Sequence, residues 1–191
     1  RGVLGVMLAA IVQRSGHEAA VKYADVRVVG GVAGQLAVQE IRLVVIATPN
    51  ETHARIGREC LEAGRDVVVD KPFATTLAEA QDLVELAKKL GRLISVYQNR
   101  RYDGVFQAMR QIVADGTLGR IVLFEPYYDR FRLALKAGAW RDRIVPGVVW
   151  FFDLAPLRLF PALLLFGLPE RVQLCAPVGV AWAGRGDGGG G

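Results

Sequence analysis

Apolar and polar positions follow two different periods along the first two thirds of the chain. Short runs rich in Val, Ile and Leu predict four β-strands, at residues 6–12, 43–47, 66–69 and 93–97. Longer stretches between the strands repeat apolar residues three and four positions apart, which is typical of amphipathic helices. Because strands that alternate with helices usually form a parallel sheet, the pattern predicts an α/β fold.

Capping residues locate the ends of several helices. Thr76 is followed three residues later by Glu79, which forms a capping box, and Gly91 stands where a C-terminal cap belongs. These residues predict a helix between Thr76 and Gly91. The spacing of apolar residues predicts two more helices, one over 54–63 and one that ends before Asp115.

Three other segments depart from this alternation. Residues 30–34 are glycine-rich, but their spacing does not fit a phosphate-binding turn, so we interpret them as a loop. Residues 120–128 predict one more strand, and no regular alternation follows them. Residues 184–191 are nearly all glycine and cannot bury enough surface to fold.

Composition narrows the class of protein. The 191 residues are 52% hydrophobic and 23% charged, so the chain can bury a core for one large or two small domains. The net charge of +5 is spread along the chain, which argues against a nucleic-acid-binding arm. Two cysteines without metal-like spacing favour a reducing cytoplasm and predict no metal site. Residues 144–168 could span a bilayer by length, but three prolines and two charges favour a buried strand, loop and helix.

Polar residues directly follow three of the predicted strands. Because right-handed crossovers bring the carboxyl ends of parallel strands to one edge of a sheet, these residues predict a ligand site there. Turns and helix caps explain any one of the loops, but they give no reason for a lysine directly beyond an apolar strand. In chain order the residues are Thr48, Pro49, Asn50 and His53; Asp70, Lys71 and Pro72; and Gln98, Asn99 and Arg100.

The order and spacing of three motifs resemble the successive signatures of the Gfo/Idh/MocA oxidoreductase family. The motifs are VIATPNETH at 45–53, VVVDKP at 67–72 and SVYQNRR at 95–101. The resemblance implies an NAD(P)-binding Rossmann-like domain over 1–101 and the start of a substrate and oligomerisation domain over 102–172. It ends there, and the glycine-rich composition near the end predicts a divergent, disordered tail over 173–191. The resemblance also implies hydride transfer between a nicotinamide cofactor and a sugar, inositol or related polyol.

Carried over residue by residue, the resemblance implies cofactor contacts for the residues at all three strand ends, Asp70 and Lys71 included. Lys71 matches the family's active-site lysine, although a surface lysine in a turn is the alternative, and the following proline invites a cis peptide bond. His53 lines the cofactor or only satisfies a backbone group. Arg14 and Ser15 follow the first predicted strand, where a Rossmann fold binds the adenosine ribose, and Arg14 slightly favours NADP over NAD.

The resemblance fails in two places. The family begins with a strand and a glycine-rich turn that holds the pyrophosphate, and the sequence has no such element. We therefore expect a truncated chain with a Rossmann-like doubly wound parallel sheet lacking its first strand, followed by an incomplete α/β second domain. Asp153 matches the aspartate of the family's Asp-x-x-x-His active-site motif, with a helix cap as the alternative, but Leu157 stands at the histidine position.

The sequence thus predicts an NAD(P)-dependent oxidoreductase with Lys71 and Asp153 as catalytic residues. A catalytically inactive fragment that binds a nucleotide or sugar is the alternative, and Leu157 favours it. The expected partner is a small sugar or polyol, without nucleic acid or membrane, and a homo-oligomer is expected only if the second domain is complete. Dinucleotide binding should be weak because the pyrophosphate turn is absent.

Overall fold

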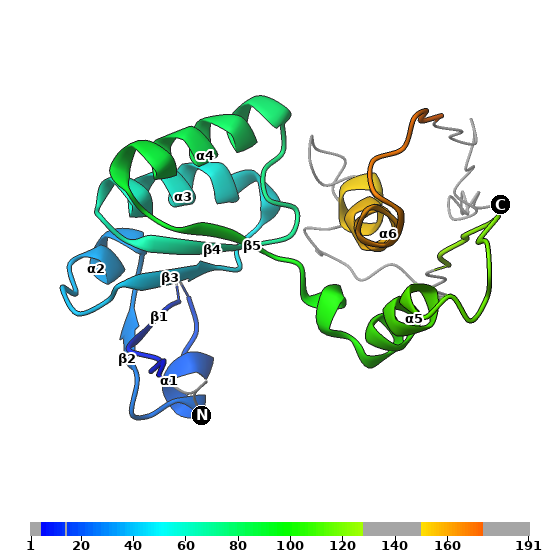
Figure 1. Ribbon diagram of the computed structural model, residues 1–191. Helices are drawn as coiled ribbons and strands as arrows, with labels where there is room; N and C mark the ends of the chain where they lie inside the picture. Colours follow the sequence, from blue (N-terminus) through cyan, green and yellow to red (C-terminus); the bar gives the residue numbers. More distant parts are fainter. Residues whose placement is uncertain (1–4, 14, 128–149, 174–191) are drawn as a thin grey trace, which may run out of the picture.

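The computed structural model describes residues 5–13, 15–127 and 150–173, with the backbone alone for 150–156. Its strands form two parallel sheets (Figure 1). In the first sheet β1 (Ala10–Val12) pairs with β2 (Arg27–Val29). The second sheet has the order β3 (Leu43–Ile46), β4 (Asp66–Asp70) and β5 (Ile94–Tyr97). The predicted α/β fold with parallel strands is therefore confirmed.

Two helices cover one face of the three-stranded sheet. Figure 1 shows α3 (His53–Glu62) and α4 (Leu77–Leu90) side by side on this face. Alternate residues of the strands point into the interface with these helices, because side chains along a strand alternate between its two faces. The fully buried core therefore combines strand and helix residues, among them Ile46, Val67, Val69, Cys60, Leu61 and Leu83.

The predicted helix α4 has both of its predicted caps. The Thr76 hydroxyl accepts a hydrogen bond from the Glu79 amide, and the Glu79 carboxylate accepts one from the Thr76 amide. Gly91 ends the helix with φ of +62°, in the left-handed region where glycine lacks the steric penalty of other residues. Because these contacts are local, the sequence was sufficient to predict them.

The two sheets are separated by an apolar cavity of about 850 Å³. Residues 5–12 form one of its walls and residues 40–46 form another, so the cavity lies between β1 and β3. A doubly wound sheet of order 3-2-1-4-5-6 carries its first strand at this place. The cavity therefore lies where the sequence analysis expects a strand to be missing.

Three predicted elements differ in the structure. Of residues 6–12, only those of β1 pair as a strand, since the edge of β1 that faces the cavity has no partner strand among the described residues. The predicted loop over 30–34 is partly wrong, because α2 (Val32–Leu36) begins within it. Residues 120–127 form no strand, since none of the described strands pairs with them. The short helix α1 (Glu18–Lys22) was not predicted from the sequence.

The apolar segment near the end of the described chain is one helix, α6 (Trp150–Phe166). The prediction that its prolines interrupt a helix is wrong for Pro156 and Pro161, which lie inside α6. The helix continues through both prolines although each removes one backbone donor, and Pro161 and Leu157 are buried. No helix in the described part of the chain combines the length and the hydropathy that a membrane span requires.

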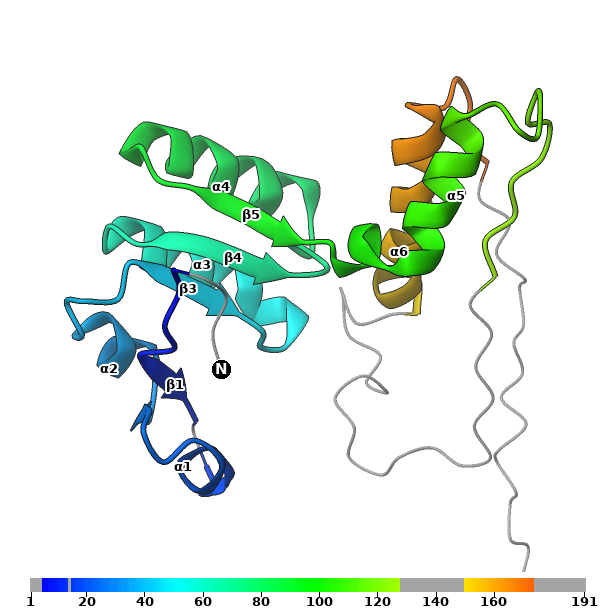
Figure 2. The same ribbon diagram turned by 60° about the horizontal axis from the view of Figure 1, so that its bottom comes forward.

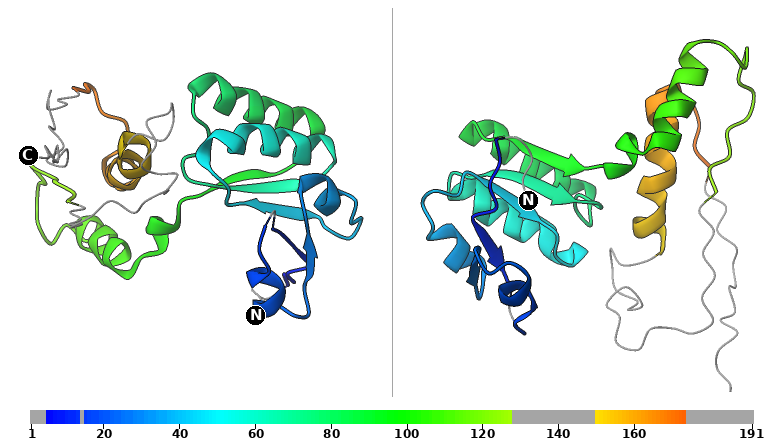
Figure 3. Two further views of the ribbon diagram at one scale, coloured as in Figure 1. Left: turned by 180° about the vertical axis from the view of Figure 1, so that it is seen from behind. Right: turned by 90° about the horizontal axis from the view of Figure 1, so that it is seen from below.

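The remaining elements connect the two regions of the chain. Beyond β5 follow a short helical turn, η2 (Asn99–Tyr102), and α5 (Gly104–Ala114), which ends before Asp115 as predicted. Figures 2 and 3 show α5 beside α6, on the side toward which the arrowheads of β3, β4 and β5 point. The predicted tail beyond residue 173 lies outside the described residues, and the predicted domain boundary at residues 101 and 102 stays a prediction.

Candidate functional site

The carboxyl ends of three strands meet at one edge of the sheet. Ile46 of β3 lies opposite Val69 of β4, and Asp70 of β4 lies opposite Tyr97 of β5. The ends of the three strands are therefore nearly level with one another in the sheet. The loops that follow them begin within two residues of the same level. Figure 2 shows this edge facing η2 and α6. The predicted gathering of the three polar loops at one edge is confirmed.

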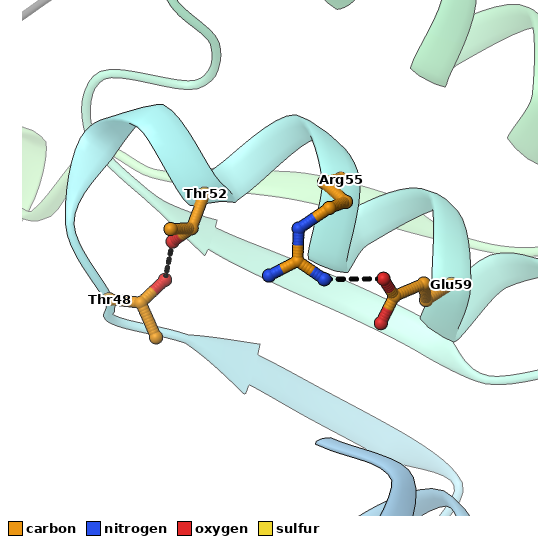
Figure 4. A network of polar contacts seen from close by, with 4 residues as sticks. All are labelled: Thr48, Thr52, Arg55 and Glu59. Carbon is orange, nitrogen blue, oxygen red and sulfur yellow. Dashed lines mark hydrogen bonds and ion pairs between the residues drawn. The ribbon is translucent and has the colours of Figure 1, made fainter. Parts of the chain in front are cut away.

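Hydroxyl groups organise the loop after β3. This loop continues into a helical turn, η1 (Asn50–Thr52), and then into α3. The Thr48 and Thr52 hydroxyl oxygens lie 2.6 Å apart (Figure 4). The Thr52 hydroxyl also donates to the Pro49 carbonyl oxygen at 2.7 Å. Because the single Thr52 proton is used in that bond, Thr48 must donate to Thr52. The exposed Thr48 hydroxyl therefore keeps its lone pairs for a donor on a ligand.

Thr52 is a residue that the sequence analysis did not assign to the site. Its hydroxyl fixes both Thr48 and Pro49, so it shapes the loop from within. The signal in the sequence is a threonine three residues after Pro49, since Ser and Thr hydroxyls commonly bond nearby backbone carbonyls in turns. Beyond it, Arg55 and Glu59 form a surface ion pair one turn apart on α3, which contributes little to stability (Figure 4).

Two polar residues of this loop are buried instead of facing solvent. Asn50 is 7% exposed and His53 is 1% exposed. The His53 ring lies between two backbone oxygens, with Nδ1 2.8 Å from the Pro72 oxygen and Nε2 2.9 Å from the Thr48 oxygen. Of the two roles that the sequence left open for His53, these contacts favour the satisfaction of backbone groups, and contact with a cofactor stays a prediction.

The loop after β4 carries the candidate catalytic lysine. The peptide bond between Lys71 and Pro72 is cis, as the sequence suggested. Lys71 is half-buried, and its backbone N–H donates to a carboxylate oxygen of Asp70 at 2.8 Å. The Asp70 side chain therefore turns toward the backbone at the start of the loop that follows β4. One of its carboxylate oxygens is used within the protein, which leaves less of its acceptor capacity for a cofactor.

The loop after β5 leads directly into η2. Gln98 precedes this turn, Asn99 and Arg100 lie in it, and Arg100 forms an ion pair with Asp103 at 2.7 Å. The neighbouring Arg101 places its guanidinium carbon 5.9 Å from the centre of the Phe160 ring in α6. This contact joins the strand edge to α6, and so keeps the helix that carries Asp153 next to the third loop.

The structure describes the remaining residues of the predicted site in less detail. Arg14 lies outside the described residues, and Ser15 is exposed, with its carbonyl oxygen accepting a hydrogen bond from Gln13 at 2.9 Å. Asp153 lies in α6, where the structure describes only its backbone. Leu157, at the position of the motif's histidine, is 5% exposed. This position is therefore buried instead of facing an open crevice.

Burial and hydrogen bonding change two ionisable groups near the site. Burial is the main cause that raises the pKa of the Cys60 thiol to about 11, so this thiol is not a reactive nucleophile. Hydrogen bonds from Thr75 and Thr76 hold the pKa of the Glu79 carboxyl below its usual value. In the described part of the chain, no group of three or more His, Cys, Asp or Glu residues is placed to hold a metal ion.

Residues 5–98 match the family model of an oxidoreductase family with an NAD-binding Rossmann fold. An uncharacterized oxidoreductase of Escherichia coli, YdgJ, is 46% identical over 134 residues, which are 70% of this chain and 38% of that protein. A scyllo-inositol 2-dehydrogenase (NADP(+)) of Bacillus subtilis, IolW, is 33% identical over 132 residues, which are 69% of this chain and 37% of that protein. This chain thus spans less than half the length of these relatives.

Solved structures agree with this comparison. An oxidoreductase structure from Klebsiella pneumoniae has a TM-score of 0.75 and 39% identity, and the match covers 86% of this chain and 44% of that one. An oxidoreductase structure from Yersinia pestis has a TM-score of 0.78 and 37% identity, with 87% of this chain and 46% of that one covered. The two matches extend the likeness beyond the three motifs to most of the chain.

Proposed function

Because the chain belongs to the Gfo/Idh/MocA oxidoreductase family, we propose that it contributes to hydride transfer between NAD(P) and a sugar, inositol or related polyol. The observation that carries this proposal is the common edge of the sheet. Thr48, Lys71 and Gln98 lie one or two residues beyond the ends of parallel strands that are in register. In open α/β sheets this edge is where ligands bind.

The described residues fit one end of a dinucleotide better than the other. At the sheet edge, the exposed Thr48 hydroxyl offers acceptor lone pairs, which suit ribose hydroxyls or a carboxamide. Near β1, the cavity stands where the strand and glycine-rich turn for a pyrophosphate would lie, and α2, with five residues, is a poor substitute for a long helix N-terminus. We therefore propose that the chain holds the nicotinamide end and binds the whole dinucleotide weakly.

Lys71 is the proposed proton-handling group. NAD(P) supplies the hydride acceptor when it is bound, and the substrate hydroxyl must lose its proton as the hydride leaves carbon. Lys71 stands half-buried at the edge of the sheet, in the middle of the three loops. Its side chain can hydrogen-bond the substrate oxygen and pass that proton on. Asp153 is the second residue that we propose as catalytic, after Lys71. It lies on α6, which the contact between Arg101 and Phe160 joins to η2.

Three finer parts of the proposal rest on the sequence. Arg14 follows β1, where a cation can neutralise a ribose 2′-phosphate, so NADP is preferred over NAD. The use of only two cysteines supports a cytoplasmic setting. The small-molecule partner is a sugar or polyol, and a homo-oligomer requires a complete second domain.

Binding without turnover is the second candidate function. Leu157 favours it, because a leucine cannot shuttle a proton and this one is 5% exposed. Titration calorimetry and saturation-transfer NMR with NADPH and NADH test the shared part of both functions, and weak binding of at least one dinucleotide is expected. If neither dinucleotide binds at any accessible concentration, hydride transfer is excluded, and of the second function only sugar binding remains.

A panel of sugars and inositols then separates the two candidate functions. Reduced nicotinamide should appear with at least one substrate if the chain is an active oxidoreductase, and with none if it only binds. Tight submicromolar binding would contradict the weak site proposed here, because that affinity requires a pyrophosphate cradle that the described residues do not supply.

A further inference from the structure

His53 stands between two of the loops at the candidate site. It is the first residue of α3, its side chain is 1% exposed, and each ring nitrogen lies at hydrogen-bond distance from a backbone oxygen. One oxygen belongs to Thr48, just beyond β3, and the other belongs to Pro72, next to Lys71. A single side chain therefore touches both the loop after β3 and the loop after β4.

The chemistry of the two partners constrains the ring. A carbonyl oxygen only accepts hydrogen bonds, so each contact requires a proton on the facing ring nitrogen. A ring with one proton would bond one loop and turn a lone pair toward the oxygen of the other loop. A ring that donates from both nitrogens is an imidazolium cation, with one positive charge. It satisfies both oxygens, and the negative ends of the two carbonyl dipoles face that charge at 2.8 and 2.9 Å.

We propose that His53 is a positioning residue that donates from both ring nitrogens, and so fixes the loop of Thr48 against the loop of Lys71. The proposal rests on the proposed function for its consequence, since these loops are the ones assigned to cofactor and substrate. In this role His53 acts through the two loops and needs no contact with the cofactor or the substrate. It sets the separation of groups that do, in the way that outer hydrogen-bonding partners orient the residues of an active site.

Ring NMR of the native chain tests the hydrogen bonds directly. The sequence has two histidines, and His17 is exposed, so it serves as an internal reference. In a chain labelled with ¹⁵N at histidine, His53 should show two slowly exchanging ring N–H groups, while the His17 ring protons exchange rapidly with water. A His53 ring with only one protonated nitrogen would overturn the proposal, and this measurement requires no variant.

Hydrogen exchange of variants tests the effect on the loops. His53→Gln keeps a buried polar group but can donate to only one of the oxygens, and Ile56→Val, at a buried position on the same helix, is the matched control. In H53Q the amides of 48–52 and 70–73 should exchange about tenfold faster or more, with 77–90 unchanged. In I56V any increase in amide exchange should reflect the lower free energy of unfolding of the whole chain. It should not be concentrated in these two loops. Equal effects of both variants on the two loops would make His53 an ordinary core residue.

NADPH affinity then connects the loops to the site. H53Q should bind NADPH about tenfold more weakly than I56V, because the loop positions are lost while the side chains remain. Unchanged affinity in H53Q would overturn the positioning role. If the native chain binds no nicotinamide dinucleotide, the proposed function fails, and the ring and exchange measurements still decide whether His53 holds the loops together.

Discussion

The hydroxyl oxygen of Thr48 lies 2.6 Å from that of Thr52, one helical turn further along the chain. Since Thr52 gives its only hydroxyl proton to Pro49, the bond runs from Thr48 to Thr52. The two threonines thus have different roles in one motif. Thr52 holds the loop, and Thr48 presents its oxygen to the open side of the sheet edge.

Thr48→Val should weaken nicotinamide dinucleotide binding without unfolding the chain. Valine keeps the shape of threonine but removes the acceptor together with the hydroxyl that donates to Thr52. The loss should be at least about three- to tenfold in Kd, the size of one hydrogen bond to the ligand. Titration calorimetry measures it. Thr117→Val, at an exposed position far along the chain, should leave binding unchanged. If both variants bind equally well, Thr48 does not contact the ligand.

The capping box of α4 should make stability depend on pH through Glu79. Hydrogen bonds lower its pKa from the usual 4.5 in the folded chain, so its contribution is complete above that value. The contribution is lost as the pH falls through the lower folded-state pKa. Urea unfolding of native chain and Glu79→Gln should differ by about 1 kcal/mol at neutral pH and converge in acid. Glu85→Gln, exposed on the same helix, is the control, and a constant difference at all pH values would contradict the linkage.

Cys60 should resist alkylation as long as the chain is folded. With a pKa of about 11, about one thiol in a thousand is ionised at pH 8, and the side chain is 0% exposed. In a Cys175→Ser background Cys60 is the single thiol, so mass spectrometry reports on it alone. Iodoacetamide should modify it only when urea unfolds the chain. Rapid modification of the native chain would mean that the α3 interface opens readily.

Turnover should require two changes together. One is a strand, glycine-rich turn and helix from a relative such as YdgJ, added before residue 5 to occupy the cavity between β1 and β3. The other is Leu157→His, which supplies a proton acceptor. Leu157→His alone should destabilise the chain by about 2 kcal/mol, since it buries a polar ring where Leu157 is 5% exposed. Activity from either change alone would show that the two do not act in series.

Lys71→Ala in the doubly changed chain should then lower kcat by about a hundredfold or more, the usual contribution of a proton-transfer group. Absorbance of reduced nicotinamide measures the rate with each polyol. The dinucleotide Kd should change little, because the lysine is assigned to the reacting hydroxyl. Lys89→Ala, exposed at the end of α4, is the matched control. A Lys71→Ala protein as fast as its parent would leave Lys71 as a turn residue only.

The local chemistry of the sequence determined much of the fold. Thr76, Glu79 and Gly91 set the ends of α4, because capping depends on residues three or four apart. The apolar runs at β3, β4 and β5 and the polar residues after them determined the common edge, since parallel strands joined by helices bring those ends together. The cis bond after Lys71 could be anticipated from Pro72, because cis peptide bonds are almost confined to bonds before proline.

Tertiary structure decided what local pattern cannot. Residues 120–127 have a strand-like sequence but pair with no described strand, and residues 6–9 face a cavity, because a strand forms only where another edge receives its hydrogen bonds. Two prolines lie inside α6, although proline is unfavourable in the interior of a helix. The position of His53 between Thr48 and Pro72 joins residues 5 and 19 apart in sequence, and only the packing of α3 against the strand ends brings them within reach.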